Sequence, residues 1–389
     1  MTQKREMLSD AANVVWAMAK ERFAKAPARS VGDVPRDGSD LTLEWLTAVL
    51  CRDVPGAEVI SWSNPSGSSG TSERMALKVQ YNSVGADAGL PTDLYTKTTA
   101  SLKQRIILGF ADGLHGETRF FTDFRPSVNM EAAQGYWGNV DESSWRSIVV
   151  MEDLAATRGA KFIDATEPLS RSQVEDVLSN LAAMHGVWWN SPELKTLRNP
   201  TEHIDNIEAL ISFKSRCKVG MKRAIDVIPS ELQGQADRLA AGTRRSLEIL
   251  TDAVPTLLHG DCHVGQTYIT ESGDMGLTDW QILMQGGWAY DFAYFVGSAC
   301  EPEDRRAWER ELLQFYLDEL STKGGDAPDF ESAWLSYRQS MFYPYSAWAF
   351  TIGRAPYQPK MQKDDTCRSI IRRTATAIAD LDSLGAVGL

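Results

Sequence analysis

The chain has 389 residues, of which 43% are hydrophobic and 24% are charged, so it is a folded globular protein with enough apolar residues for a sizeable core. Its 40 Lys and Arg residues against 52 Asp and Glu residues give a formal net charge of -12, which argues against nucleic acid or an anionic membrane as a partner. The 5 scattered cysteines include no CxxC pair, which excludes a disulfide scaffold and a four-thiolate zinc site.

No apolar run near the N-terminus has the length of a signal peptide, and no segment reaches the roughly 20 apolar residues of a membrane helix. We therefore expect a cytoplasmic protein without a membrane partner, as a monomer or a homodimer. A helix over residues 12–23, followed by a connector rich in Pro, Gly and Asp, indicates an N-terminal helical extension over residues 1–40.

Strands dominate the next part of the chain, residues 41–155. Alternation of apolar and polar residues, or short apolar runs, predicts strands over residues 58–62, 75–81, 94–98 and 148–151. One helix is expected through Trp45 and Leu50, and a second one carries Phe120, Phe121 and Phe124 on one stripe.

Helices dominate from residue 156 to residue 389. Ser170 and Gln173 have the spacing of a capping box, and the apolar residues that follow repeat with helical periodicity. Further helices are expected around residues 308–320 and 364–384. A strand-rich segment followed by a helical one predicts the α+β class.

The segment from Leu257 to Trp280 carries the most chemistry. Turn residues 271–274 separate two short strand-like runs, and the resulting hairpin would return Asp279 to the neighbourhood of Asp261 and Gln266. These three side chains offer oxygen ligands, which suit Mg²⁺.

In residues 259–266 (HGDCHVGQ) the chain resembles the H-G-D-x-H-x-x-N loop of the kinase-like phosphotransferases, which include aminoglycoside phosphotransferases, choline kinases and ecdysteroid-kinase-like (CHK-like) proteins. Residues 279–281 (DWQ) resemble their metal-binding D-W segment. The resemblance implies that Asp261 is the catalytic aspartate and that Gln266 and Asp279 hold Mg²⁺. The chain departs from the family at Gln266, where the family has Asn, so the metal geometry is expected to change.

The same resemblance implies a bilobal, protein-kinase-like fold, with a small N-terminal lobe around an antiparallel sheet and a larger, mainly helical C-terminal lobe. Nucleotide would bind in the groove between the lobes. Lys97 matches the strand lysine that pairs the α- and β-phosphates, and Glu117 matches its helical ion-pair partner. The other expected nucleotide contacts are backbone groups near Glu152 and Leu154 and a Gly- and Ser-rich hairpin of Ser66, Gly67, Ser68, Ser69, Gly70 and Thr71.

Four further features are interpreted as structural. His185 is expected in the core, His259 as a support for the loop, and Asp291 as the residue that ties the loop to the helical core. The aromatic residues between Trp334 and Phe350 are expected to be core, with some of them available to line the acceptor site.

The leading hypothesis is an ATP-dependent kinase, with ATP and Mg²⁺ as cofactors, that phosphorylates a hydroxyl group of a small molecule. The acceptor stays open, with a partly apolar alcohol favoured over an antibiotic. Protein-kinase and Walker-type NTPase motifs are absent from the sequence. Two alternatives remain: a catalytically weak nucleotide-binding relative, suggested by Gln266, and a zinc hydrolase that uses His259, Asp261 and His263.

Overall fold

A computed structural model of the chain describes every residue except 1, 24–26, 70–71, 111–112, 357 and 359. The chain divides into two compact units. Unit 1 comprises residues 1–127, 132–160 and 280–282, and unit 2 comprises residues 128–131, 161–279 and 283–389. None of the helices in the described part of the chain combines the length and apolar character needed to cross a bilayer.

Unit 1 is built on an antiparallel sheet in the order β1-β3-β4-β6-β5, with β2 paired to β3. Its strands are β1 (Val59–Ser63), β2 (Gly67–Ser69), β3 (Glu73–Tyr81), β4 (Asp93–Thr98), β5 (Gly135–Asp141) and β6 (Arg146–Glu152). Its helices are α1 (Thr2–Phe23), α2 (Leu43–Leu50), α3 (Ser83–Asp87), α4 (Leu102–Phe110), α5 (Gly116–Arg119) and α6 (Leu154–Arg158).

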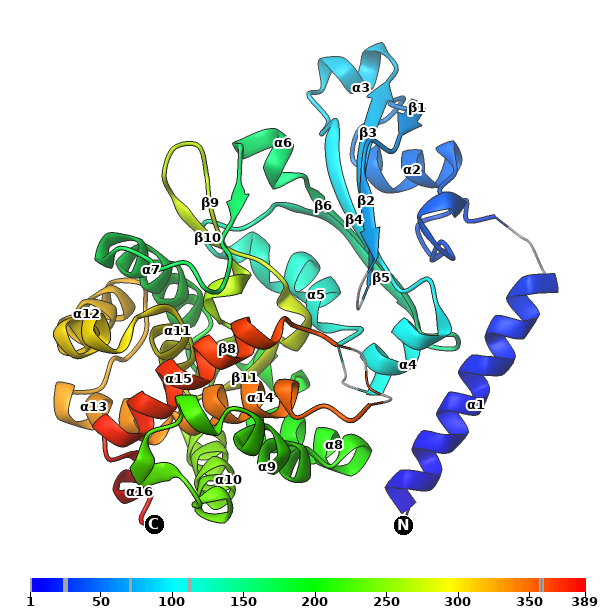
Figure 1. The fold of residues 1–389 in the computed structure, drawn as a ribbon. Coiled ribbons are helices and arrows are strands. Elements are labelled where there is room, and N and C mark those ends of the chain that lie inside the picture. Colours follow the sequence, from blue (N-terminus) through cyan, green and yellow to red (C-terminus); the bar gives the residue numbers. More distant parts are fainter. Residues whose placement is uncertain (1, 24–26, 70–71, 111–112, 357, 359) are drawn as a thin grey trace. The chain divides into compact units, whose positions relative to one another are not determined.

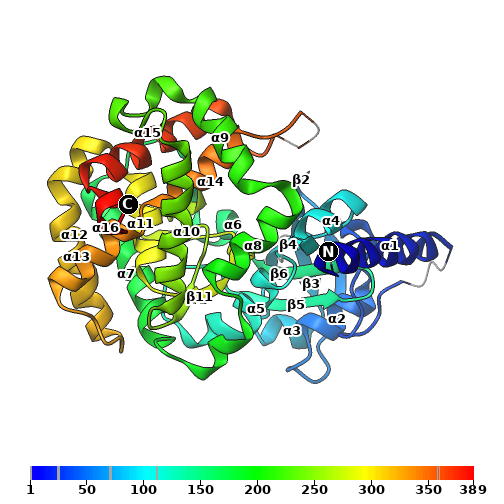
Figure 2. The same cartoon turned by 90° about the horizontal axis from the view of Figure 1, so that it is seen from below.

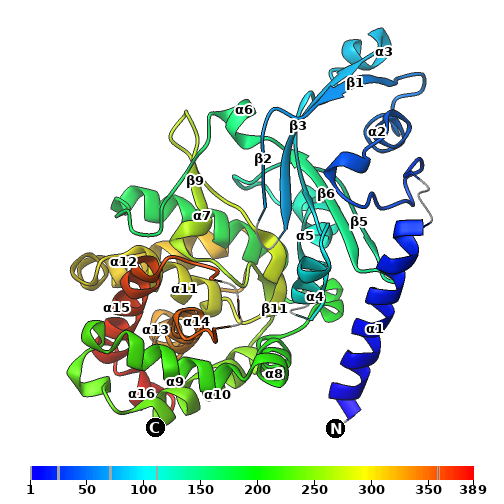
Figure 3. The same ribbon diagram turned by 45° about the vertical axis from the view of Figure 1, so that its right-hand side comes forward.

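The two faces of this sheet pack against different helices (Figures 1 and 3). Thr42 caps α2 by accepting the amide of Trp45, and this helix buries its apolar face against one side of the sheet. The other side faces α5 and the π-helical turn Phe120–Phe124. The approach of α5 to β5 is close, because a Cβ atom added at Gly138 would lie only 3.0 Å from the Cα atom of Thr118. The face that carries Lys97 is therefore the α5 face.

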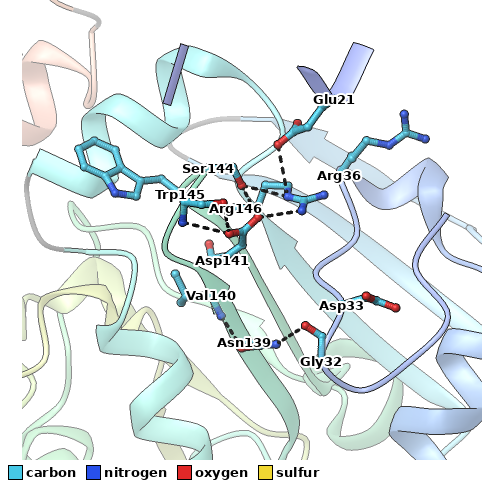
Figure 4. Close-up of polar contacts among 12 residues, drawn as sticks. Glu21, Gly32, Asp33, Arg36, Asn139, Val140, Asp141, Ser144, Trp145 and Arg146 are labelled. Carbon is cyan, nitrogen blue, oxygen red and sulfur yellow. Dashed lines mark hydrogen bonds and ion pairs between the residues drawn. The ribbon is translucent and has the colours of Figure 1, made fainter. Parts of the chain in front are cut away.

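Within unit 1, the carboxylate of Glu21 on helix α1 contacts the β5–β6 hairpin (Figure 4). Glu21 accepts hydrogen bonds from both terminal nitrogens of the buried Arg105, at 2.9 and 3.0 Å, and lies 3.4 Å from Arg146. Arg146 also donates to Asp141 at 2.8 Å, at the tip of the β5–β6 hairpin. The helix begins about ten residues before the expected start at residue 12.

Unit 2 is mainly helical. Its helices are α7 (Arg171–Val187), α8 (Pro200–Ile211), α9 (Phe213–Arg223), α10 (Ala236–Asp252), α11 (Ala289–Ala299), α12 (Pro302–Thr322), α13 (Phe330–Gln339), α14 (Phe342–Ile352), α15 (Asp364–Asp380) and α16 (Ser383–Ala386). Short strands β7 (Lys161–Phe162), β8 (Thr256–Leu258), β9 (Thr267–Ile269), β10 (Met275–Leu277) and β11 (Met284–Gly286) form two small sheets. The capping box of Ser170 and Gln173 is confirmed at the start of α7.

Candidate active site

The loop after β8 is held by one buried aspartate. Gly260 has φ 81°, a left-handed conformation that glycine adopts without a Cβ penalty. Asp291, on α11 and fully buried, accepts the amides of His259 at 2.6 Å and Gly260 at 3.0 Å, and lies 3.3 Å from His185 Nε2. The expectation that Asp291 ties this loop to the helical core is confirmed, and His185 is a core residue, 0% exposed.

The carboxylate of Asp261 has two side-chain donors. Tyr294 Oη donates to Oδ1 at 3.0 Å, and Gln266 Nε2 donates to Oδ2 at 3.3 Å. The side chain of Asp261 is 34% exposed, and the protein packed around it still withdraws water from the carboxyl group. This desolvation, reinforced by the negative charge of Asp279, raises the pKa of Asp261 to about 6 against the opposing effects of His259 and of its hydrogen bonds from Tyr294 and Gln266.

The hairpin that was expected to return Asp279 is present. Strands β9 and β10 pair antiparallel, with Thr267 opposite Leu277, and the amide of Thr278 donates to the carbonyl of Gln266 at 2.9 Å. Asp279 follows with φ 68°, which is uncommon for a residue with a side chain and is frequent at functional sites. The structure thus brings Asp261, Gln266 and Asp279 into one neighbourhood.

The donor chemistry of this group fits Mg²⁺. Two carboxylates and one amide supply only oxygen ligands, and Mg²⁺ in proteins is usually held by one or two carboxylates together with water and phosphate oxygens. Gln266 and Asp279 are the residues that would hold the ion.

The arrangement does not fit a zinc triad. His259 Nδ1 accepts the amide of Asp261 at 3.3 Å, and its Nε2 lies 3.0 Å from the carbonyl of Thr278, so both ring nitrogens have backbone partners. Within the described residues no group of three or more His, Cys, Asp and Glu side chains could hold a metal ion. The zinc alternative therefore loses its ligand set, and His259 supports the loop as expected.

In unit 1, Lys97 of β4 and Glu117 of α5 form an ion pair at 2.7 Å, with side chains only 8% and 5% exposed. This confirms the expected pair. The close approach of α5 to residues 280–282 requires Gly116, because a Cβ atom there would lie 2.4 Å from the carbonyl oxygen of Gln281. Phe120 stacks on Trp280 with ring centroids 3.6 Å apart, so the residue after Asp279 is packed beside the α5 segment.

The structure describes part of the Gly- and Ser-rich hairpin that was expected to contact the nucleotide. Gly67, Ser68 and Ser69 form β2 and pair with β3, and the carbonyl of Ser66 accepts the amide of Ala76 at 2.9 Å. Gly70 and Thr71 lie outside the described residues.

Several polar groups of the connector after β6 form hydrogen bonds within the protein. The side chain of Glu152 accepts hydrogen bonds from Arg158 at 2.7 and 2.8 Å and from Thr157 at 2.7 Å. Its amide donates to Gln134, and the amide of Asp153 donates to Asp93. Leu154 begins α6 and is buried. Any contact of this connector with a nucleotide base would therefore use other groups than these two amides.

Tyr294 and Asn180 were not predicted as site residues, and Trp280 was predicted only as part of the D-W segment. Tyr294 lies three residues after Asp291, and this helical spacing places both side chains toward the same loop. Asn180, buried within α7, donates to the carbonyl of Met275 at 2.9 Å and so anchors the hairpin. The signal for Asn180 was a polar residue within the apolar stripe of a predicted helix.

The model of the ecdysteroid kinase-like family matches residues 130–325. A comparison with curated protein sequences finds no significant match.

Several solved structures are similar to the chain. A candidate aminoglycoside phosphotransferase from Ralstonia eutropha JMP134 gives a TM-score of 0.51 at 13% identity, covering 87% of this chain and 97% of that one. A choline kinase from Streptococcus pneumoniae gives 0.43 at 13% identity, covering 86% and 96%. An ethanolamine kinase from Plasmodium vivax gives 0.45 at 12% identity, covering 83% of each chain. The first likeness shows the fold, and the expected α+β, bilobal protein-kinase-like architecture is confirmed.

Proposed function

The chain belongs to the ecdysteroid kinase-like family of kinase-like phosphotransferases, and from this premise we propose that it transfers the γ-phosphate of ATP to a hydroxyl group of a small molecule. The observation that carries the proposal is the group around Asp261. One carboxylate, held by Tyr294 and Gln266 on a loop anchored by Asp291, is accessible to an incoming hydroxyl group.

Each residue of the proposal has a defined task. Asp261 orients the attacking hydroxyl and accepts its proton. Lys97, held in position by Glu117, neutralises charge on the phosphates, and the ion pair compensates the buried ammonium group on β4. Mg²⁺, held by Gln266 and Asp279, would supply further neutralisation of the phosphate charge.

We propose a partly apolar alcohol as the acceptor. Aromatic side chains surround the Asp261 loop within unit 2: the rings of Tyr294 and Tyr343 lie 6.0 Å apart, and those of His263 and Trp348 lie 5.0 Å apart. Rings of this kind favour a substrate with apolar surface near its hydroxyl group.

The experiment is incubation with ATP and Mg²⁺ against a panel of hydroxyl compounds, with mass spectrometry of the products. We expect one class of alcohol to gain the mass of a phosphoryl group. Asp261→Asn, which preserves the shape of the side chain, should reduce this transfer by at least about a hundredfold, the usual contribution of a general base. Transfer at the wild-type rate in this variant would remove Asp261 from its proposed role.

One observation favours a second candidate, a nucleotide-binding protein with little or no transfer. Gln266 stands where the family has Asn, and its amide nitrogen donates to Asp261 Oδ2 at 3.3 Å, which occupies one acceptor of the proposed base. Gln266→Asn distinguishes the two candidates. The second candidate would be favoured if the wild type binds ATP without transferring phosphate and the Gln266→Asn variant does transfer it.

A further inference from the structure

His263, on the loop that follows β8, uses only one of its two ring nitrogens within the protein. The amide of Gly265 donates to Nδ1 at 3.0 Å, so this side chain caps the short 3-10 helix Val264–Gln266. Nε2 has no hydrogen-bond partner within the part of the chain that the structure describes. It is not among the enclosed polar atoms that lack a partner, so it remains accessible although the side chain is only 5% exposed.

The bond from Gly265 decides which nitrogen of His263 carries the proton. A backbone amide can only donate, so Nδ1 is unprotonated and the proton of the neutral ring lies on Nε2. Burial lowers the pKa of His263 to about 4 against the opposing effect of Asp279, so the ring is neutral near pH 7. His263 therefore presents one N–H donor at its accessible nitrogen.

Ring contacts fix the direction of this donor. The ring of His263 meets that of Trp348 edge to face, with centroids 5.0 Å apart, and its centroid lies 6.1 Å from that of Tyr294. Trp348 belongs to α14 and Tyr294 to α11, two helices of unit 2 that contact each other (Figure 2). Together with the bond from Gly265, these contacts hold Nε2 beside the carboxylate of Asp261.

The distance between His263 and Asp261 leaves room for one atom that bonds to both. Nε2 lies 3.8 Å from Asp261 Oδ2, which is too long for a direct hydrogen bond. An oxygen about 2.9 Å from each of the two atoms would accept a hydrogen bond from Nε2 and donate one to the carboxylate. A hydroxyl group can do both, whereas a protonated amine has no lone pair with which to accept.

We propose that His263 donates a hydrogen bond to the oxygen of the acceptor's hydroxyl group and so directs the hydroxyl proton to Asp261. This inference rests on the proposed function and adds a second contact with the acceptor. In the transfer step the hydroxyl proton moves to Asp261, and the hydroxyl oxygen forms a bond to the γ-phosphorus. The bond from that phosphorus to the bridging oxygen breaks and releases ADP, and His263 keeps its own proton throughout.

Two substitutions separate a contact with the acceptor from support of the loop. His263→Asn keeps an acceptor near the position of Nδ1, because Asn is a good N-cap residue, but it removes the outer N–H donor. His263→Gln can place an amide N–H near the position of Nε2, but it removes the acceptor for the amide of Gly265.

The first probe is water, which has the required O–H group, and release of phosphate from ATP with Mg²⁺ measures its attack. The second probe is the alcohol of the panel that the wild type phosphorylates fastest. With either probe, the turnover of His263→Asn should fall at least about tenfold, with the KM for ATP unchanged, and His263→Gln should retain more activity than His263→Asn. A residue that only supports the loop would give the reverse order. That order, or wild-type turnover in His263→Asn, would overturn the inference.

Nuclear magnetic resonance of the resting protein tests the position of the proton without any transfer. In the full chain with nitrogen-15-labelled histidine, the signal that His263→Asn removes should show a protonated Nε2 and an unprotonated Nδ1 at pH 7. A protonated Nδ1 would overturn the inference and leave the proposed function intact. A wild type that neither hydrolyses ATP nor phosphorylates any compound of the panel would refute the proposed function, and this inference with it.

Discussion

Single buried residues decide the geometry of the candidate active site. Asp291 accepts hydrogen bonds from two consecutive backbone amides, those of His259 and Gly260. Asp291 also contacts Nε2 of His185, and Nδ1 of His185 lies 2.6 Å from the hydroxyl of Tyr316. The loop that carries Asp261 is thereby connected to α7, α11 and α12.

Asp291→Ala should lower the free energy of unfolding by about 3 kcal/mol, because it leaves buried amide donors without an acceptor. Asp291→Asn retains one side-chain oxygen and should lose about half as much. Urea denaturation followed by circular dichroism measures both. Equal stability of the Ala variant and the wild type would show that the loop has another anchor.

The buried pair of Lys97 and Glu117 gives a second prediction at this scale. Lys97→Met leaves the Glu117 carboxylate without its cation and should cost about 3 to 5 kcal/mol. The double variant Lys97→Met/Glu117→Leu removes both charges and should recover most of this loss while nucleotide affinity stays impaired. Strictly additive losses in the unfolding free energy would contradict a coupled pair.

At the scale of elements, patterns with a clear period were predicted correctly. The alternation in β3, the apolar runs in β4 and β6, and the capped stripe of α7 all depend on local residue order. Strand β5, with the sequence GYWGNVD, was missed because its glycines and Asn have low strand propensity, and its pairing with β6 supplies the missing stability. Helix α4 was missed because it is short and ends beside Gly109.

The connector from β6 to α6 makes a prediction about acid. Burial opposes ionisation of Glu152, but hydrogen bonds from Arg158, Thr157 and the Gln134 amide outweigh it and lower the pKa of the carboxyl group. A group with a lowered folded-state pKa stabilises the fold above its unfolded-state pKa, and this stabilisation is lost as the pH falls through the folded-state value.

The wild type should therefore exceed Glu152→Gln in unfolding free energy at neutral pH, and the difference should shrink as the pH falls from about 5 to about 3. Guanidinium unfolding at several pH values measures it. Because the Gln side chain has nearly the same shape as Glu, the substitution changes the charge at residue 152 and leaves the packing nearly unchanged. A difference that stays constant across this range would exclude the assigned ionisation.

At the scale of the whole molecule, the sequence predicted which residues of the loop and hairpin lie together, as well as the structural roles of His259 and Asp291. The proximity of Asp261, Gln266 and Asp279 was predicted because a hairpin with recognisable turn residues joins them. The contact of Tyr294 with Asp261 and the stacking of Trp280 on Phe120 were not predicted, because a partner that is distant in sequence leaves no periodic signal. Nor does a single cut near residue 155 describe the two units, because residues 128–131 and 280–282 each belong to the unit opposite their sequence neighbours.

We propose that the chain binds a metal–nucleotide complex and that Lys97 and Asp279 are both needed for this binding. Electron paramagnetic resonance with Mn²⁺ in place of Mg²⁺ tests it without any knowledge of the acceptor. Mn²⁺ and ATP together should give a bound signal with the wild type that neither gives alone, and Asp279→Asn and Lys97→Met should each weaken this signal at least tenfold. A wild-type chain that never binds Mn²⁺ with ATP, or variants that bind the pair as tightly as the wild type, would contradict the account.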